Sequence, residues 1–260
     1  MSQAYPMSFR MRLPNAEYFA DLIKAISAVV EEGTFMVDEN SIRMVSMDPA
    51  HISLVDFGLD KSAAEEYVCS EPMNITVSIT ELLKFLKRAK KSEGITISYE
   101  GDKKKLTILL VDMASSRERS FTMNALEPVA SRTAVPNLTF EAAARVSTDA
   151  LVDAIEDSSL VSDYVRFSIS PDAVTLSAKG DVGAAQVRLS KASPTVYEIR
   201  ADKEVWANFS INYVEKIVKA AKTLSDEVTI ELSTNKPIRF EFPIPSGKLG
   251  YLVAPRIETA

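Results

Sequence analysis

The sequence predicts an α+β protein built from two similar domains. Its 260 residues are enough for two domains of about 130 residues, each with its own core. The stretch Ser78–Lys91, SITELLKFLKRAKK, recurs without a gap as Ser210–Lys222, SINYVEKIVKAAK. Around each copy, the patterns run in the order strand, helix, strands, helix, strands. Such a duplication means that one α+β unit is used twice.

The first half is expected to open with a strand and a helix. Phe9–Leu13 alternates between apolar and polar residues, and Pro14 ends it. Asn15 can cap a helix over Ala16–Val30, where the apolar residues recur at helical spacing. Alternating runs between turn residues predict further strands on both sides of the repeated helix: Thr34–Val37, Ile42–Met47, His51–Leu59, Asn74–Val77, Ile95–Tyr99, Leu106–Val111 and Arg117–Asn124.

The two halves are joined by a segment that fits neither the helical nor the strand period. Ala125–Asn137, ALEPVASRTAVPN, carries two prolines and is interpreted as an extended linker. The predicted domains are therefore 1–124 and 138–260, with a connecting segment at 125–137. In the second half a helix is expected over Thr148–Ser159. The strands expected there are Phe140–Val146, Val165–Ile169, Val174–Ala178, Ala185–Leu189, Val196–Ile199, Trp206–Phe209, Val228–Leu232, Ile238–Phe242 and Leu249–Val253.

The repeated helix has an apolar stripe and a basic face. In the first copy the apolar positions are 79, 82, 83, 86 and 89, and four cations fall on the other side: Lys84, Lys87, Arg88 and Lys91. Lys216 and Lys219 occupy the places of Lys84 and Lys87 in the second copy. A solvated lysine face is common on surface helices, but packing alone does not require lysine in both copies. The repeat therefore favours a basic patch that contacts phosphate.

Composition limits the classes of function. The net charge of −6 argues against a protein whose whole surface binds nucleic acid, although a local basic patch is compatible with it. No apolar run reaches the ~18 residues of a membrane span, and the N-terminus lacks the apolar core of a secretion signal. The single cysteine, Cys69, excludes an internal disulfide and a cysteine-based zinc cluster, and it suggests a reducing compartment.

The residues offer little for catalysis. His51 is the only histidine, and a structural hydrogen bond in its turn is the expected role. Ser246-Gly247-Lys248 lacks the first glycine and the final hydroxyl residue of a phosphate-binding loop. The acidic residues of the third helix could hold a divalent cation, but such clusters are more often a solvated face: Asp149, Asp153, Glu156 and Asp157. We therefore expect no enzyme, no catalytic or metal-binding residue, and no cofactor.

Long sheet edges are the other expected consequence of so many strands. Exposed edges invite pairing with another chain. Pairing Arg117–Asn124 of one subunit with Gly183–Leu189 of the next would be a head-to-tail contact, which closes into a ring if the rotation allows. The residues expected at this subunit interface are Arg119, Phe121, Met123, Ala185, Val187 and Leu189.

Two motifs carry a family resemblance. Val45–Leu54, VSMDPAHISL, and Tyr251–Glu258, YLVAPRIE, resemble the signature and the closing motif of the proliferating cell nuclear antigen type of DNA sliding clamp. Ala125–Asn137 lies where that family has its interdomain connecting loop, and the resemblance covers roughly residues 8–258. The short N-terminal extension and the lack of an acidic tail are similar to archaeal members.

The resemblance implies a ring of three clamp-fold subunits, with the helices of each domain on the inner face around duplex DNA and the antiparallel sheets outside. It implies a processivity factor in the cytoplasm at the nucleoid, or in a nucleus. The implied partners are double-stranded DNA of any sequence, two further clamp subunits (identical or paralogous), DNA polymerase, a clamp loader, a flap endonuclease and DNA ligase, without a membrane. The implied DNA-contacting residues are Lys24, Lys84, Lys87, Arg88, Lys91, Arg145, Lys216, Lys219 and Lys222.

The resemblance also implies a pocket for a partner peptide with hydrophobic anchors. The matching residues are Met47, His51, Ile52, Leu54, Thr133, Val135, Pro136, Pro237, Leu252, Ala254, Pro255 and Arg256. Ordinary core packing is the alternative role for the apolar ones. Thr133 stands where many relatives have a larger aliphatic residue, so a shallower pocket is expected there.

The third helix departs from the family pattern because it carries four acidic residues and no basic one. Asp153 occupies the place that corresponds to Lys24 in the first half. Three interpretations stay open. The chain could be one specialised subunit of a heterotrimeric ring, the acidic side could face bulk solvent, or the protein could be a scaffold of the same fold that does not grip DNA.

Overall fold

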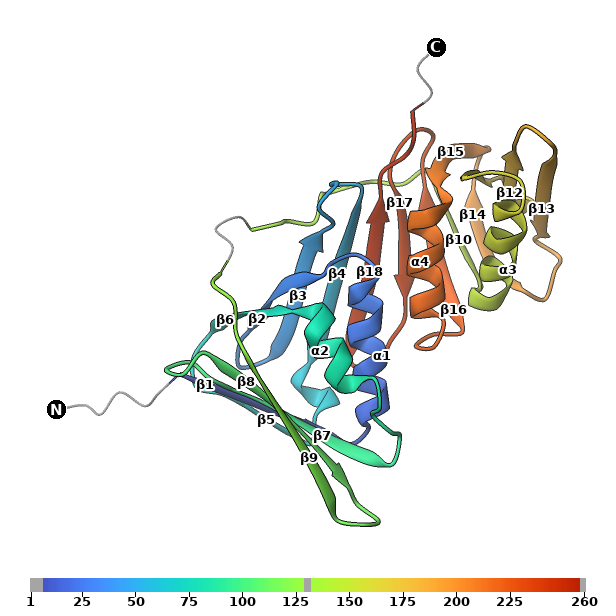
Figure 1. Ribbon diagram of the computed structural model, residues 1–260. Coiled ribbons are helices and arrows are strands. Elements are labelled where there is room, and N and C mark those ends of the chain that lie inside the picture. The colour runs from blue at the N-terminus through green and yellow to red at the C-terminus, as the bar shows by residue number, and fades with distance from the viewer. Residues whose placement is uncertain (1–6, 129–131, 258–260) are drawn as a thin grey trace. The chain divides into compact units, whose positions relative to one another are not determined.

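The computed structural model describes residues 7–128 and 132–257 (Figure 1). The chain forms two compact units. The first contains 1–46, 56–134 and 244–248, and the second contains 47–55, 135–243 and 249–260. Each unit thus contains a short segment from the other half of the sequence, 244–248 in the first unit and 47–55 in the second. None of the described helices has the length and apolar character needed to cross a membrane.

The first half of the chain contains two helices and nine strands among its described residues. In chain order they are β1 (Ser8–Leu13), α1 (Ala16–Ser27), β2 (Glu32–Val37), β3 (Ser41–Met47), β4 (Ser53–Asp60), the 3-10 turn η1 (Lys61–Ala63), β5 (Glu66–Cys69), β6 (Met73–Ser78), α2 (Ile79–Leu86), β7 (Glu93–Glu100), β8 (Lys105–Asp112) and β9 (Arg117–Asn124). One antiparallel sheet has the order β5-β1-β7-β8-β9. Another row of strands has the order β4-β3-β2-β6.

The second half repeats this arrangement. Its elements are β10 (Ala142–Ser147), α3 (Thr148–Ser159), β11 (Tyr164–Ile169), β12 (Ala173–Lys179), β13 (Ala184–Ser190), β14 (Val196–Ala201), β15 (Val205–Ser210), α4 (Ile211–Ala221), β16 (Glu227–Leu232), β17 (Ile238–Phe242) and β18 (Gly247–Val253). One sheet has the order β13-β12-β11-β15. The other row has the order β14-β10-β16-β17-β18. The α+β class and the two similar halves are therefore confirmed.

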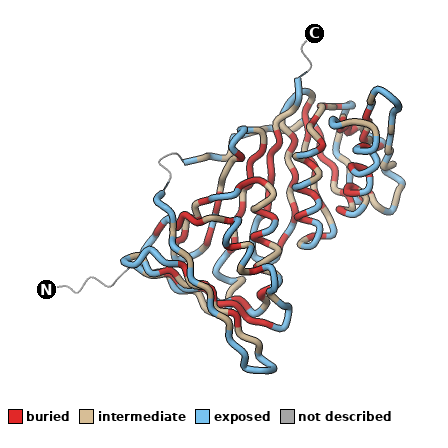
Figure 2. Tube along the Cα trace, viewed as in Figure 1, coloured by how far each residue is buried: buried red, intermediate tan, exposed pale blue. Residues whose placement is uncertain are grey.

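Side-chain caps start three of the helices. The Asn15 side chain accepts a hydrogen bond from the backbone N–H of Tyr18 at the start of α1. Ser78 and Ser147 cap α2 and α3 in the same way. These caps satisfy N–H groups that have no partner inside the helix. Within each unit the two helices pack side by side, α1 on α2 and α3 on α4, with their apolar stripes buried (Figures 1 and 2).

The expected helices Ala16–Val30 and Ser78–Lys91 are too long. The first ends at Ser27 and α2 ends at Leu86. The Glu93 carboxylate accepts the backbone N–H of Lys90 at 2.9 Å, which turns the chain into β7 before the helix can continue. The short strand β5 was not predicted, because its four residues lack the length of a clear alternation.

Candidate nucleic-acid interface

Each unit presents an exposed basic edge on its helix pair. In α2 the stripe residues Ile79, Leu82 and Leu86 are buried, whereas Lys84 and the C-terminal cap residue Lys87 are exposed. In α4 the equivalent Ile211, Val214 and Val218 are buried, and the equivalent lysines are exposed: Lys216 and Lys219. The predicted separation of an apolar and a basic side is therefore present in both units. The helical position of Lys87, Arg88 and Lys91 is wrong, because α2 ends at Leu86: Lys87 is its C-terminal cap, and the other two lie in the turns beyond it.

The cations of the first unit are largely free of carboxylates. Lys84 pairs with Glu81 of the same helix, with 2.6 Å between Nζ and Oε1. Over the residues that the structure describes, Lys24, Lys87, Arg88 and Lys91 have no ion pair. Their positive charge is therefore available to an external anion.

The second unit differs because the acidic residues of α3 pair with the lysines of α4. Nζ of Lys219 lies 2.9 Å from Oε1 of Glu156 and 3.0 Å from Oε1 of Glu215. Nζ of Lys222 lies 3.2 Å from Oδ1 of Asp149. Hydrogen bonds to Glu156 and then to Glu215 raise the pKa of Lys219 above its ordinary value. Half of the acidic face is thus directed at the neighbouring helix.

The remaining groups of this helix pair are unpaired within the described chain. Asp153 and Asp157 are exposed and have no ion pair there, and the same holds for Lys216. Lys216 is therefore the cation of α4 that an external anion meets without competition from a carboxylate.

Arg145 does not belong to the basic edge. It lies on β10, where its neighbours Ala144 and Val146 point to the buried side of the sheet. Its own side chain points the other way, 2.7 Å from Oε2 of Glu227 and over the ring of Tyr197 at 5.3 Å. The position directly before α3 suggested a channel residue, but strand alternation directs the side chain away.

The motif Val45–Leu54 forms a turn around one buried carboxylate. Asp48 accepts hydrogen bonds from the backbone N–H groups of Ala50, Ile52 and Ser53 at 3.0, 2.7 and 2.6 Å. Asp48 was not predicted as a functional residue, although an Asp-Pro pair is a recognised turn signal. The backbone N–H of His51 donates to the carbonyl oxygen of Asp48 at 3.0 Å, whereas its side chain is exposed, so the expected structural hydrogen bond of the imidazole stays a prediction.

The C-terminal motif lies against this turn. The backbone N–H of Ala254 donates to the carbonyl of Ile52 at 2.8 Å, which aligns the two motifs that carried the family resemblance. Burial separates the predicted pocket residues into three groups. Leu54 and Leu252 belong to the core. The half-buried members are Met47, Ile52, Thr133, Val135, Pro237, Ala254 and Pro255, and the exposed ones are His51, Pro136 and Arg256.

Arg256 takes part in a different arrangement from the one expected. Its guanidinium group stacks on the ring of Tyr164 at 3.6 Å, and both residues line a hollow on the outer strands of the second unit.

The two strands expected at a subunit interface are both sheet edges. Among the described residues, β9 is the last strand of the five-stranded sheet and pairs with β8 alone, and β13 is the last strand of the four-stranded sheet and pairs with β12 alone. Two of the three predicted side chains on β9 are already engaged inside the first unit. Arg119 lies 2.7 Å from Glu93, and Phe121 stacks on Phe85 of α2 with 5.1 Å between ring centroids. The free hydrogen-bonding groups of these edges are therefore backbone groups.

The chain matches two family models that together span most of it. They are the N-terminal domain of proliferating cell nuclear antigen over residues 8–129 and its C-terminal domain over residues 134–257. The chain is 32% identical over 245 residues to a DNA polymerase sliding clamp 1 of Pyrobaculum aerophilum, covering 94% of this chain and 96% of that one. It is 31% identical over 254 residues to a DNA polymerase sliding clamp of Cenarchaeum symbiosum, covering 97% and 100%.

Solved structures agree on the fold. The crystal structure of proliferating cell nuclear antigen from Thermococcus kodakaraensis superimposes with a TM-score of 0.88 at 23% identity, covering 95% of this chain and all of that one. The corresponding protein of Entamoeba histolytica gives a TM-score of 0.88 at 22% identity. The family matches and the archaeal relatives lead to one conclusion: the chain belongs to the proliferating cell nuclear antigen family.

Proposed function

We propose that this protein is a subunit of a ring-shaped DNA sliding clamp, a processivity factor that holds DNA polymerase on duplex DNA and catalyses no reaction itself. The observation that carries the proposal is the repeated helix pair, which buries an apolar stripe and exposes cations in each unit. Lysine and arginine contact phosphates regardless of base sequence, as sliding requires. No cofactor is part of the proposal.

The ring would contain three subunits, identical or paralogous. The open edges β9 and β13 support pairing between neighbours, because each has an unpaired row of backbone groups. The proposed domains are 1–124 and 138–260, joined by 125–137. Light scattering of the purified chain over a range of concentrations tests the composition of the ring. A stable trimer supports identical subunits, whereas a persistent monomer means that the edges require paralogous partners.

The partner site is proposed around the Asp48 turn and the C-terminal motif that pairs with it. DNA polymerase, a clamp loader, a flap endonuclease and DNA ligase are the proposed occupants in turn. Each would insert short hydrophobic anchors beside the half-buried Met47 and Ile52. The clamp would act by raising the effective concentration of the tethered enzyme at its template.

Charge reversal tests the DNA-contacting face. In the test variant Lys84, Lys87, Lys216 and Lys219 are changed to glutamate. A matched control reverses four exposed lysines outside the helix pairs, so that both variants have the same net charge: Lys61, Lys105, Lys191 and Lys236. The readout is primer extension by an archaeal DNA polymerase on a linear template, with circular dichroism to verify folding. We expect the test variant to lose stimulation and the control to keep it; equal stimulation by both would refute the assignment.

A further inference from the structure

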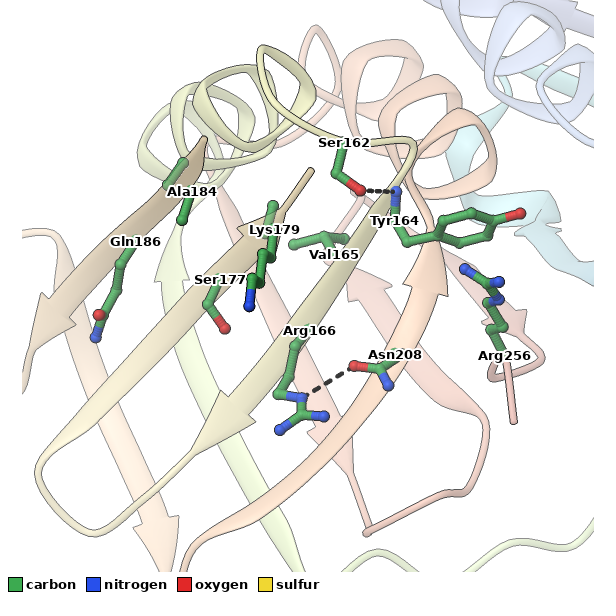
Figure 3. Close-up of a pocket in the computed structure, with 12 residues that line it drawn as sticks. Ser162, Tyr164, Val165, Arg166, Ser177, Lys179, Ala184, Gln186, Asn208 and Arg256 are labelled. Carbon is green, nitrogen blue, oxygen red and sulfur yellow. Dashed lines mark hydrogen bonds between the residues drawn. The ribbon is translucent and has the colours of Figure 1, made fainter. Parts of the chain in front are cut away.

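A hollow of about 570 Å³ lies on the sheet β13-β12-β11-β15 (Figure 3). One row of paired residues crosses its floor: Asn208, Arg166, Ser177 and Gln186. Directly paired residues project to the same face of a sheet, so the four side chains share this face. The alternate residues of β11, Val165 and Phe167, are buried on the opposite side, where α3 packs.

Three cations surround the hollow, and two of them are fixed by aromatic rings. The guanidinium of Arg166 lies 3.9 Å from the ring centroid of Trp206, and its Nε donates to Oδ1 of Asn208 at 3.0 Å. The guanidinium of Arg256 is held over Tyr164. Lys179 is the third cation and is exposed. Such stacking holds each guanidinium in place while the remaining N–H donors stay directed outward.

The hollow has no negative charge of its own. No aspartate or glutamate lines it, and none of its three cations forms an ion pair with a described residue. This is notable in a chain with 36 acidic and 30 basic residues. The remaining lining side chains are mostly neutral hydrogen-bonding groups, including Ser162, Ser177 and Gln186. The hollow is therefore complementary to an anionic ligand.

We propose that this hollow binds an extended acidic peptide segment of a partner protein, with carboxylates at alternate positions. Lys179 lies two residues along β12 from Ser177, the partner of Arg166, so the backbone positions of the two cations are diagonal neighbours about 7–8 Å apart. Alternate side chains of an extended peptide lie about 6.6 Å apart on one face, which matches this spacing. The volume is within the roughly 300–1,000 Å³ of ordinary ligand sites.

Single-stranded nucleic acid fits the hollow less well. Its binding sites combine cations with aromatic faces on which bases stack. Here the faces of Trp206 and Tyr164 are covered by the guanidinium groups of Arg166 and Arg256. The hollow also lies on the sheet face away from α3. Its cations come from β11, β12 and the segment after β18, and none comes from the edge strand β13.

The test uses the full chain and a fluorescein-labelled peptide of four Glu-Ser repeats, with a peptide of four glutamates followed by four serines as the spacing control. Fluorescence anisotropy is measured for the wild type and three variants. Lys179→Glu removes a cation of the hollow, Arg166→Lys keeps the charge but loses the planar fork, and Lys191→Glu is an exposed control at the other end of β13.

We expect the alternating peptide to bind the wild type more tightly than the block peptide. Lys179→Glu should weaken binding about tenfold and Arg166→Lys about threefold, whereas Lys191→Glu should change it less than twofold. No binding, or equal losses for Lys179→Glu and Lys191→Glu, would overturn the proposal. A single-stranded oligonucleotide that binds through Lys179 more tightly than the peptide would overturn it in favour of nucleic acid. Because the readout involves neither duplex DNA nor a polymerase, failure here leaves the proposed clamp function intact.

Discussion

The ion pairs between α3 and α4 lead to a quantitative prediction for DNA binding. Glu156 and Asp149 compete with phosphate for Lys219 and Lys222. Replacing both acids by their amides, Glu156→Gln and Asp149→Asn, removes the carboxylates of α3 from the two lysines without a change of shape. Lys222 then has no carboxylate partner among the described residues, whereas Lys219 keeps Glu215 of its own helix. The salt dependence of binding reports how many phosphates are neutralised, at about −0.9 in log K against log salt per phosphate.

The expected change follows from this relation. Because Lys222 is freed completely and Lys219 only in part, the slope should steepen by about 0.9 to 1.8 per subunit in contact with the duplex. Between 50 and 200 mM salt, such a difference corresponds to about a three- to twelvefold larger loss of affinity. The assay is fluorescence anisotropy with a linear duplex whose ends are open, because a ring can thread onto it without a loader.

The control variant changes the net charge by the same amount as the test variant but leaves the ion pairs of Lys219 and Lys222 intact. Asp153→Asn with Asp157→Asn removes two carboxylates from the same helix, and neither acid has an ion pair among the described residues. It should strengthen binding through the general field and leave the slope nearly unchanged. A slope that rises equally in both variants, or in neither, would refute the competition argument.

A direct measurement of the lysine provides a second check. The carboxylates of Glu156 and Glu215 raise the pKa of Lys219. In the Glu156→Gln variant, NMR titration of the Lys219 ammonium group should give a pKa closer to the ordinary value. A group with a raised pKa in the folded state contributes stability that is lost as the pH rises through that pKa. The variant should therefore lose less stability than the wild type in alkaline solution.

Three further predictions concern single contacts. Arg119→Ala leaves the buried carboxylate of Glu93 without its cation and should lower the free energy of unfolding in urea by about 3–5 kcal/mol; a loss under about 1 kcal/mol would contradict the role of this pair. Asp48→Ala removes the acceptor of three backbone N–H groups and should lower the free energy of unfolding in urea by about 2–3 kcal/mol. It should also abolish binding of a partner peptide, which a peptide titration would report. Hydrogen bonds from the backbone of Asn40 and Ser41 lower the pKa of Asp38, so Asp38→Asn should destabilise the protein at neutral pH, and unfolding measured against pH should show this difference disappearing below about pH 3.8.

Much of the fold follows from local patterns. The helices and almost all strands have apolar residues at a period of 3.6 or 2, and the repeat supplied the order of elements twice. The end of α2 could not be predicted, because it depends on a hydrogen bond between Lys90 and Glu93 that no helical pattern contains. The short β5 is a strand mainly because β1 offers it an edge.

The site was predictable in composition and less so in geometry. The lysines and the acidic residues of α3 are visible in the sequence, but their distances depend on how α3 crosses α4. Arg145 and Arg256 show the same limit. Strand alternation turns the first away from the helices, and a ring contact with Tyr164 holds the second beside another hollow. The sequence position suggested that Arg145 lies at the DNA-contacting face and Arg256 at the partner pocket. The direction of each side chain places it on a different surface instead.

Lys87 and Lys219 occupy the same place in the repeat, and their surroundings differ. Lys87 has no ion pair among the described residues, whereas Lys219 contacts two carboxylates. The difference arises from Glu156 of the neighbouring helix α3 and from Glu215 of α4 itself. At this shared place a phosphate meets an uncompensated charge only in the first unit, and in α4 the cation without an ion pair among the described residues is Lys216. The duplicated fold thus keeps its core symmetric while the charge available to DNA is unequal, and this inequality is a property of helix pairs rather than of single helices.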